Sequence, residues 1–249
     1  LTALTGPSWS QDDTPADDGG TGVMAMTIST SRAEDNGEYD PLQYQKVYIY
    51  NSEGGLLRKY AAKDDIPERL ELLSGTYRVA VEAGEQVPAD FSKRFYKGEE
   101  TFTVKPGETT HAEVVCKIAN TVVEVKFDAS IVENLDPGYF VWIAGTDKFD
   151  EAEAESGAVP ALKFTDEGTG YYTLPAGTTS LAWMFRGTHT SGKQVEMENT
   201  LTEVKAGGKY VFTFRYSPDL PGYIDALLIL VDTETEDKDD KIIFSPDPA

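Results

Sequence analysis

The chain contains very few of the residues on which metal, redox and nucleophilic chemistry depend. Cys116 is its single cysteine, and His111 and His189 are its two histidines among 249 residues. One cysteine cannot close an internal disulfide, and its place on the apolar face of an extended run predicts a small buried side chain instead of a reactive thiol. Neither histidine has a cysteine or carboxylate at a spacing typical of zinc sites. We therefore expect both histidines at the surface, and neither a metal nor a cofactor.

Positive charge is also scarce. The 22 Lys and Arg residues face 43 Asp and Glu, which gives a formal net charge of −21. Such a chain repels nucleic acid and anionic membrane surfaces, and this excludes both as direct partners. No apolar run reaches the roughly 20 residues of a membrane-spanning helix. Contact with a membrane would therefore need a lipid anchor, which a cysteine directly before Leu1 in the full gene would indicate.

Motifs of known catalytic sites do not occur in the sequence. It has no G-x-S-x-G, H-E-x-x-H, P-loop or glycine-rich dinucleotide pattern. With 43 acidic residues, carboxylate pairs arise by chance, so a glycosidase pair is not predicted. We expect a non-catalytic protein, since an enzyme would need a pocket with convergent polar groups and shifted pKa values.

Strand-forming patterns dominate what the sequence does contain, most clearly in residues 101–127. Apolar residues alternate with polar ones along this stretch, and the phase of the alternation changes after Asn120. Fully extended, residues 109–127 would span roughly 60 Å, whereas an ordinary strand spans about 17–20 Å. This length predicts two strands in line, with residues 119–121 passing the chain from one β-sandwich to the next.

Turn and strand signals repeat along the chain. Residues 73–76 (LSGT) and 174–178 (LPAGT) each precede a strand pattern, as do residues 104–107 (VKPG) and 204–207 (VKAG). The glycines of these turns are 32 residues apart in the first half and 30 in the second. The repeat predicts an all-β fold of two tandem Ig-like or transthyretin-like sandwiches. We expect a flexible leader over 1–21, an N-terminal sandwich over 22–119 and a C-terminal sandwich over 120–249.

Two segments are expected outside the strands. Residues 84–100 are too irregular for a strand pattern, but they carry Phe91, Arg94, Phe95 and Tyr96. Because aromatics and arginine are enriched at interfaces, these four could form a partner surface; alternatively, the aromatics cover the open end of the first sandwich. Residues 148–158 form an acidic stretch that fits either one helical turn or a loop.

Two further kinds of ligand site are weighed on composition. The acidic segment 232–240 could chelate calcium through carboxylate oxygens, but it lacks the glycine and spacing of a known calcium loop, so a solvated loop is the alternative. A carbohydrate-binding module would need a flat exposed aromatic set such as Trp142, Trp183 and Tyr171. Trp142 and Trp183 lie in apolar strand patterns, and we expect them buried.

One motif resembles a known family. Residues 115–120 (VCKIAN) resemble the V-C-K-x-x-N signature of a lipoprotein family of unknown function from Bacteroidetes. Residues 47–55, Ile66-Pro67-Glu68, Leu72–Tyr77 and Phe95–Gly98 follow the same pattern, except that Leu73 stands where the family often has proline. The resemblance covers about residues 44–127. It implies a secreted, lipid-anchored protein of the outer membrane or periplasm with no assigned enzyme activity.

The expected two-sandwich plan is also similar to fimbrillins, the subunits of Bacteroidetes pili. That resemblance implies a trypsin-like cut after an arginine, removal of the first strand, and entry of a donor strand from the next subunit. Arg32, just after the strand pattern 22–30, is where such a cut would fall, and residues 226–231 could be the donor. Alternatively, Arg32 is an ordinary loop residue and the first strand stays in its own sheet. We expect a role in adhesion or pilus-like surface assembly, with like subunits, other proteins or host glycans as partners.

Overall fold

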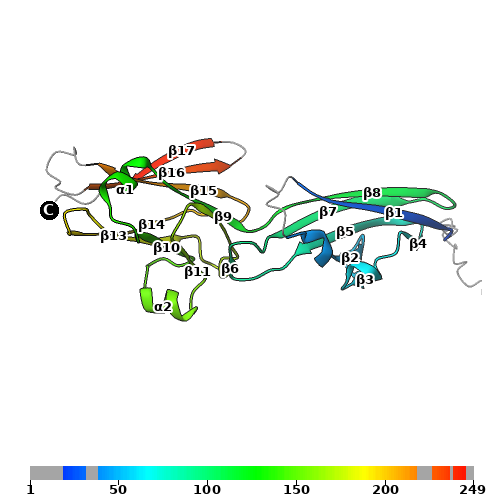
Figure 1. Ribbon diagram of the computed structural model, residues 1–249. Coiled ribbons are helices and arrows are strands. Elements are labelled where there is room, and N and C mark those ends of the chain that lie inside the picture. The colour runs from blue at the N-terminus through cyan, green and yellow to red at the C-terminus, as the bar shows by residue number, and fades with distance from the viewer. Residues whose placement is uncertain (1–18, 32–38, 218–225, 236–237, 245–249) are drawn as a thin grey trace, which may run out of the picture.

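The computed structural model describes residues 19–31, 39–217, 226–235 and 238–244, with side chains described to residue 216. Two elongated lobes lie end to end, and nearly all of their regular structure is β-strand (Figure 1). The all-β, two-sandwich fold class expected from the sequence is therefore confirmed.

The N-terminal lobe consists of seven strands and two short 3-10 helices. The strands are β1 (Thr21–Thr30), β2 (Lys46–Asn51), β3 (Leu56–Tyr60), β4 (Arg69–Leu73), β5 (Gly75–Gly84), β7 (Phe95–Val104) and β8 (Thr109–Ile118), and the 3-10 helices are η1 (Pro41–Tyr44) and η2 (Lys63–Asp65). The strand order is β3-β2-β5-β7-β8-β1-β4. Because β7 and β8 pair at only two positions, the sheet folds over into two layers, β3-β2-β5-β7 and β8-β1-β4. Alternate residues of β5 and β8 point into the core between these layers.

The C-terminal lobe has two separate sheets and two short helices. Its elements are β9 (Thr121–Phe127), α1 (Ala129–Asn134), β10 (Phe140–Ala144), α2 (Glu151–Ser156), β11 (Ala161–Phe164), β12 (Gly168–Tyr172), β13 (Leu181–Thr188), β14 (Gln194–Leu201), β15 (Lys209–Ser217), β16 (Ala226–Thr235) and β17 (Lys238–Phe244). One sheet has the order β11-β10-β13-β14. The other has the order β17-β16-β15-β9-β12-β6, in which β6 (Ala89–Asp90) comes from the N-terminal half of the chain. Their inner faces enclose an aromatic core that includes Trp183, Phe185, Phe212 and Phe214.

The two lobes repeat one topology. In each, the first strand pairs in parallel with the strand that follows the glycine turn, β1 with β8 and β9 with β15. Each first strand also pairs antiparallel with a second neighbour, β4 or β12. The opposite layers correspond too, since β3-β2-β5-β7 matches β11-β10-β13-β14. The repeated turn signals thus reflect a repeated fold.

Two segments of the chain pass between the lobes. The main crossing lies between β8 and β9, but β6 (Ala89–Asp90) leaves the N-terminal part of the chain and pairs with β12 of the C-terminal lobe. Residues 84–100 are therefore not uniformly irregular, because they contain β6 and the start of β7. The segment 232–240 is also more regular than a loop, since pairing between β16 and β17 continues to Thr235 and resumes at Lys238. Of the two alternatives for residues 148–158, the structure has the helical turn, α2.

Candidate functional site: the first strand and the lobe junction

Strand β1 occupies a central position in its layer. It pairs over Val23–Thr30 with β8 and over Thr21–Ala25 with β4. Met24 is buried, and Met26 and Ile28 pack against the same core from partly buried positions. A strand with partners on both edges cannot leave without exposing two unpaired edges and an apolar strip.

The predicted cleavage site lies outside the described residues. Arg32 is not described, and the last contact before it is the backbone N–H of Ser31, which donates to the carbonyl oxygen of Cys116 at 2.7 Å. The structure therefore holds β1 within its own sheet. Cleavage after Arg32 stays a prediction, as does the flexible leader, most of which is also outside the described residues.

Three of the four residues expected to form a partner surface are buried. Arg94, Phe95 and Tyr96 are 2%, 4% and 1% exposed. The prediction is therefore wrong for these three, because Phe95 and Tyr96 begin β7 and pair with β5. Phe91 is 46% exposed and packs edge-on against Phe164 of the other lobe, with ring centroids 5.1 Å apart. The segment thus joins the lobes.

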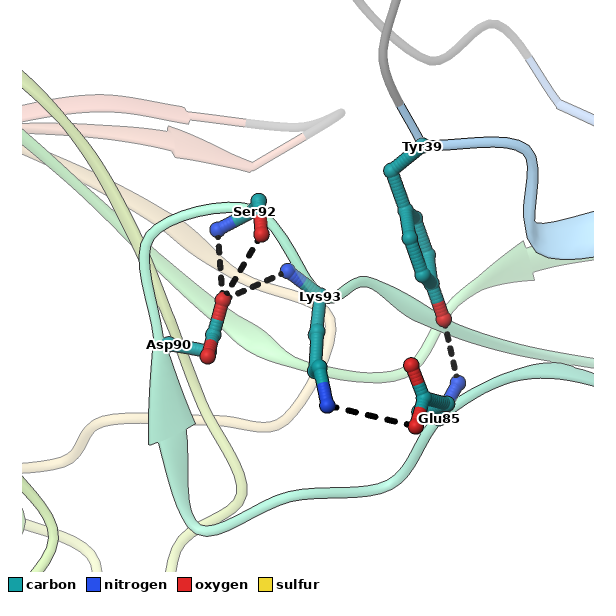
Figure 2. Close-up of polar contacts among 5 residues, drawn as sticks. All are labelled: Tyr39, Glu85, Asp90, Ser92 and Lys93. Carbon is teal, nitrogen blue, oxygen red and sulfur yellow. Dashed lines mark hydrogen bonds and ion pairs between the residues drawn. The ribbon is translucent and has the colours of Figure 1, made fainter.

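A short polar chain fixes the connection that carries β6 across the junction (Figure 2). The Asp90 carboxylate accepts hydrogen bonds from the backbone N–H groups of Ser92 and Lys93 at 2.8 and 2.9 Å. Burial alone raises the pKa of Asp90, but these bonds outweigh it and hold that pKa below its ordinary value. Lys93 Nζ pairs with Glu85 at 3.2 Å, and the N–H of Glu85 donates to the Tyr39 hydroxyl at 2.6 Å.

Arg94 links the segment between β5 and β7 to the residues that precede η1. Its Nη2 donates to the carbonyl oxygen of Tyr39 at 2.7 Å, and its guanidinium lies 5.8 Å from the centre of the Tyr39 ring. Burial raises the pKa of the Tyr39 hydroxyl to about 12. Tyr39 is therefore held from two sides.

Asn120 is the last residue of the motif at residues 115–120, and it connects both lobes where the chain passes from β8 to β9. Its Oδ1 accepts from the N–H of Phe95 at 2.6 Å in a fully buried bond, and its carbonyl oxygen accepts from Gly207 at 2.9 Å. The N–H of Ala119 adds a bond to the Phe95 carbonyl oxygen at 2.8 Å. One side chain thus connects β7 to the strand-to-strand crossing.

Replacing Asn120 with alanine should loosen this crossing. The N–H of Phe95 would be left buried without its acceptor, which costs about 1–3 kcal/mol. We expect the free energy of unfolding to fall by that amount, and amide exchange at Phe95 to accelerate in the folded protein. Asn199→Ala is the control: its Oδ1 accepts from the N–H of Thr200 at 2.7 Å, but this bond is exposed and water can replace it, so stability should change by less than about 0.5 kcal/mol. Equal effects of the two substitutions would contradict a joining role for Asn120.

Two hollows flank the β5–β6 connection. One of about 520 Å³ lies beside η1 and η2, and one of about 440 Å³ lies against the loop after α2 and the residues following β12. Both are lined by Gln86 and Val87. Volumes in this range are typical of small-ligand sites, so each is a candidate cavity.

The aromatic residues expected for sugar binding do not form an open platform. Trp183 is fully buried, as predicted, and Tyr171 is 7% exposed. Trp142 is half-buried, and the Lys163 ammonium lies 5.6 Å from the centre of its ring. These three residues therefore do not provide the flat exposed set that a sugar site would need.

The residues weighed for metal or thiol chemistry lie apart from one another. Cys116 is buried in the N-terminal core, as predicted, and burial raises the pKa of its thiol to about 11. His111 is exposed on β8, and His189 bonds to Ser191 at 2.7 Å. Within the described part of the chain, no three metal-ligating side chains converge.

The side chains of the acidic segment 232–240 lie outside the described residues, so calcium binding there stays a prediction. Among the described helices, none is long and apolar enough to cross a membrane.

The sequence reasoning missed the residues that shape the junction and the larger hollow. Tyr39, Tyr44 and Gly84 lie in segments with no strand pattern. The Asp40-Pro41 step was an available signal, since aspartate followed by proline favours the start of a helical turn. In the structure Asp40 caps η1 by accepting from the N–H of Leu42 at 2.9 Å.

Comparisons with known proteins agree with this architecture. A family model described as a domain of unknown function, DUF4493, matches residues 21–246. No curated protein matches the chain. A candidate cell adhesion protein from Bacteroides eggerthii DSM 20697 has a similar structure, with a TM-score of 0.51 and 10% identity over 86% of this chain and 96% of that one.

Two other solved structures are similar at lower scores. A candidate cell adhesion protein from Bacteroides uniformis ATCC 8492 has a TM-score of 0.48 and 13% identity, over 86% of this chain and 98% of that one. The fimbrial anchor protein Mfa2 from Porphyromonas gingivalis has a TM-score of 0.39 and 10% identity, over 84% and 97%. At 10% identity, the likeness to the Bacteroides eggerthii protein concerns the fold alone.

Proposed function

The chain belongs to the DUF4493 family, and we propose that it is a non-catalytic protein of the Bacteroidetes cell surface or periplasm that acts in adhesion or pilus-like assembly. The observation that carries the proposal is the central, two-sided pairing of β1 immediately before Arg32. The Bacteroides eggerthii protein with the same fold is a candidate cell adhesion protein, which supports extending that role to this chain. A lipid anchor would keep the protein at the membrane and belongs to the proposal.

A cut after Arg32 would make β1 exchangeable. It would separate β1 from the rest of its lobe and leave the strand held by its two ladders and its apolar strip. Departure of β1 would open a groove between β4 and β8, whose unpaired backbone groups another strand can satisfy by β-augmentation. A strand of a second copy would then link one subunit to the next.

The donor strand has to come from outside the groove. β16, which contains the apolar run 226–231, pairs in this structure with β15 on one edge and β17 on the other. It would have to leave that sheet before it could enter the groove of another subunit. The proposal therefore requires one strand to leave each of two sheets.

Limited trypsin digestion of the folded chain tests the proposal. We expect a fast cut after Arg32, loss of the fragment that carries β1, and growth of higher oligomers. Mass spectrometry identifies the cut, and size-exclusion chromatography detects the oligomers. The Arg32→Gln variant is the control and should stay intact at this position and monomeric. Polymerisation by strand exchange is contradicted if the cut chain remains a monomer with β1 still bound.

A further inference from the structure

We propose that the 520 Å³ hollow of the N-terminal lobe binds a neutral oligosaccharide. The hollow lies beside η1, η2 and the end of β5, and its lining includes Gln43, Tyr44, Lys46, Lys63, Glu82 and Gln86. None of its lining residues belongs to β1, β4 or β8. The inference therefore goes beyond strand exchange and does not depend on it.

An exposed aromatic ring stands at the hollow on a rigid support. Tyr44 is 47% exposed, and its ring stacks on that of Tyr39 with centroids 5.7 Å apart and planes 13° from parallel. Tyr39 is fixed in turn by the N–H of Glu85 and by Arg94. An aromatic ring held in place before binding loses little conformational freedom when a ligand stacks on it.

The 3-10 helix that carries Tyr44 is itself anchored. Asp40 accepts hydrogen bonds from the N–H of Leu42 and from the Gln43 amide, at 2.9 and 2.8 Å. Pro41 is buried, and Leu42 packs against the N-terminal core. The helix therefore presents Tyr44 and Gln43 together at the hollow from a defined position.

Charge around the hollow favours an uncharged ligand. The lining carries two lysines, Lys46 and Lys63, and two carboxylates, Glu82 and Glu85. The carboxylates also pair with Lys97 and Lys93 outside the lining, and the chain as a whole carries a net charge of −21. An anionic ligand would be repelled at long range, and a cationic one would find both ammonium groups in the lining. Neutral polar groups fit better, because the amides of Gln43 and Gln86 can each both donate and accept.

The mixture of one aromatic surface and many polar groups distinguishes a sugar from an apolar ligand. The apolar part of the lining is limited to Ala61, Ala62, Val87 and the largely buried Phe95, besides Tyr44. A pyranose ring has an apolar C–H face, which stacks on an aromatic ring, and an edge of hydroxyls, which bind amides and carboxylates. Both halves of that chemistry are present within one hollow.

Native-gel affinity electrophoresis of the full chain tests the inference. The gels would contain a neutral soluble polysaccharide, taken in turn from mannan, galactomannan, xyloglucan, mixed-linkage glucan and starch. We expect at least one of them to retard the protein, and calorimetric titration with its oligosaccharides to show saturable binding. Tyr44→Ala should weaken that binding about tenfold, whereas Tyr44→Phe keeps the ring and should bind within about threefold of the original chain.

Phe91→Ala is the matched control. Phe91 is exposed to the same extent as Tyr44 but does not line the hollow, so its loss should leave sugar binding unchanged. Near-ultraviolet circular dichroism checks that each variant is folded, and Gln86→Ala supplies a second variant within the hollow that should also weaken binding. Failure of every neutral polysaccharide, equal retardation of the Tyr44→Ala variant, or saturable binding of peptides instead of sugars would each overturn the inference.

Discussion

Alanine at position 84 is expected to destabilise the protein by about 3 kcal/mol or more. Gly84 ends β5 with φ of +91°, a backbone conformation that costs an L-residue energy even in open space. In addition, a β-carbon at this position would overlap the carbonyl oxygen of Arg94, which is backbone and cannot rotate away. The chain would have to move β5 or the start of β7.

A second glycine separates the two contributions. Gly54 has φ of +83°, but a β-carbon there would meet nothing within 4 Å. Gly54→Ala should therefore cost only the conformational strain, about 1–2 kcal/mol. Urea denaturation of both variants gives the comparison, and equal losses of unfolding free energy would show that the contact with Arg94 is unimportant. A larger loss at Gly84 would establish close backbone packing at the point where the chain leaves for the other lobe.

Strands in which polar and apolar residues alternate were predictable from the sequence. β5 buries Tyr77, Val79 and Val81 in turn, as expected from a period of two, because each of these residues faces one core and its neighbours face solvent. The change of phase after Asn120 marked the crossing between lobes for the same reason, since the buried face changes with the sandwich that supplies the core. Because the same glycine-turn signals recur in the second half of the chain, they predicted a second lobe with the same strand arrangement as the first.

The junction could not be predicted in this way. Phe95 and Tyr96 are adjacent and both buried, so the start of β7 shows no alternation. The cause is long-range: Tyr96 belongs to the N-terminal core, whereas Phe95 lies outside that cluster and lines the hollow beside η1 and η2, with its N–H bonded to Asn120 at the crossing. The pairing of β6 with β12 joins residues about 80 positions apart and leaves no local pattern. Likewise, the stacking of Tyr39 on Tyr44 depends on the capped turn between them.

Removal of β1 should have the largest effect of all, and a peptide should reverse it. A chain that starts at residue 33 lacks the strand between β4 and β8, together with the apolar side chains of Met24, Met26 and Ile28. Each such side chain contributes about 1.5–3 kcal/mol when fully buried, and both flanking ladders are lost. We expect the shortened chain to unfold readily or to associate through the open groove.

The peptide of residues 19–31 supplies the missing strand. Its register is set by eight residue pairs with β8, from Val23 opposite Thr109 to Thr30 opposite Cys116. Because the groove is preformed only when the rest of the lobe is folded, part of the burial energy is used to order the peptide and the lobe. We expect a dissociation constant on the order of micromolar, measured by fluorescence anisotropy of a labelled peptide.

Two substituted peptides show whether the groove recognises a strand by its buried face. Met24→Lys places a charge where the side chain is 2% exposed, and should abolish binding, since a buried unpaired charge costs several kcal/mol. Thr27→Lys adds the same charge to an exposed position of the same strand, and should bind as the original peptide does. If both lysine peptides bind with equal affinity, the groove does not recognise a strand by the apolar side chains of its buried face. The contrary result is a shortened chain that stays a stable monomer and binds none of the peptides. In that case β1 is no more than one strand of a closed sheet, and strand exchange has no physical basis in this protein.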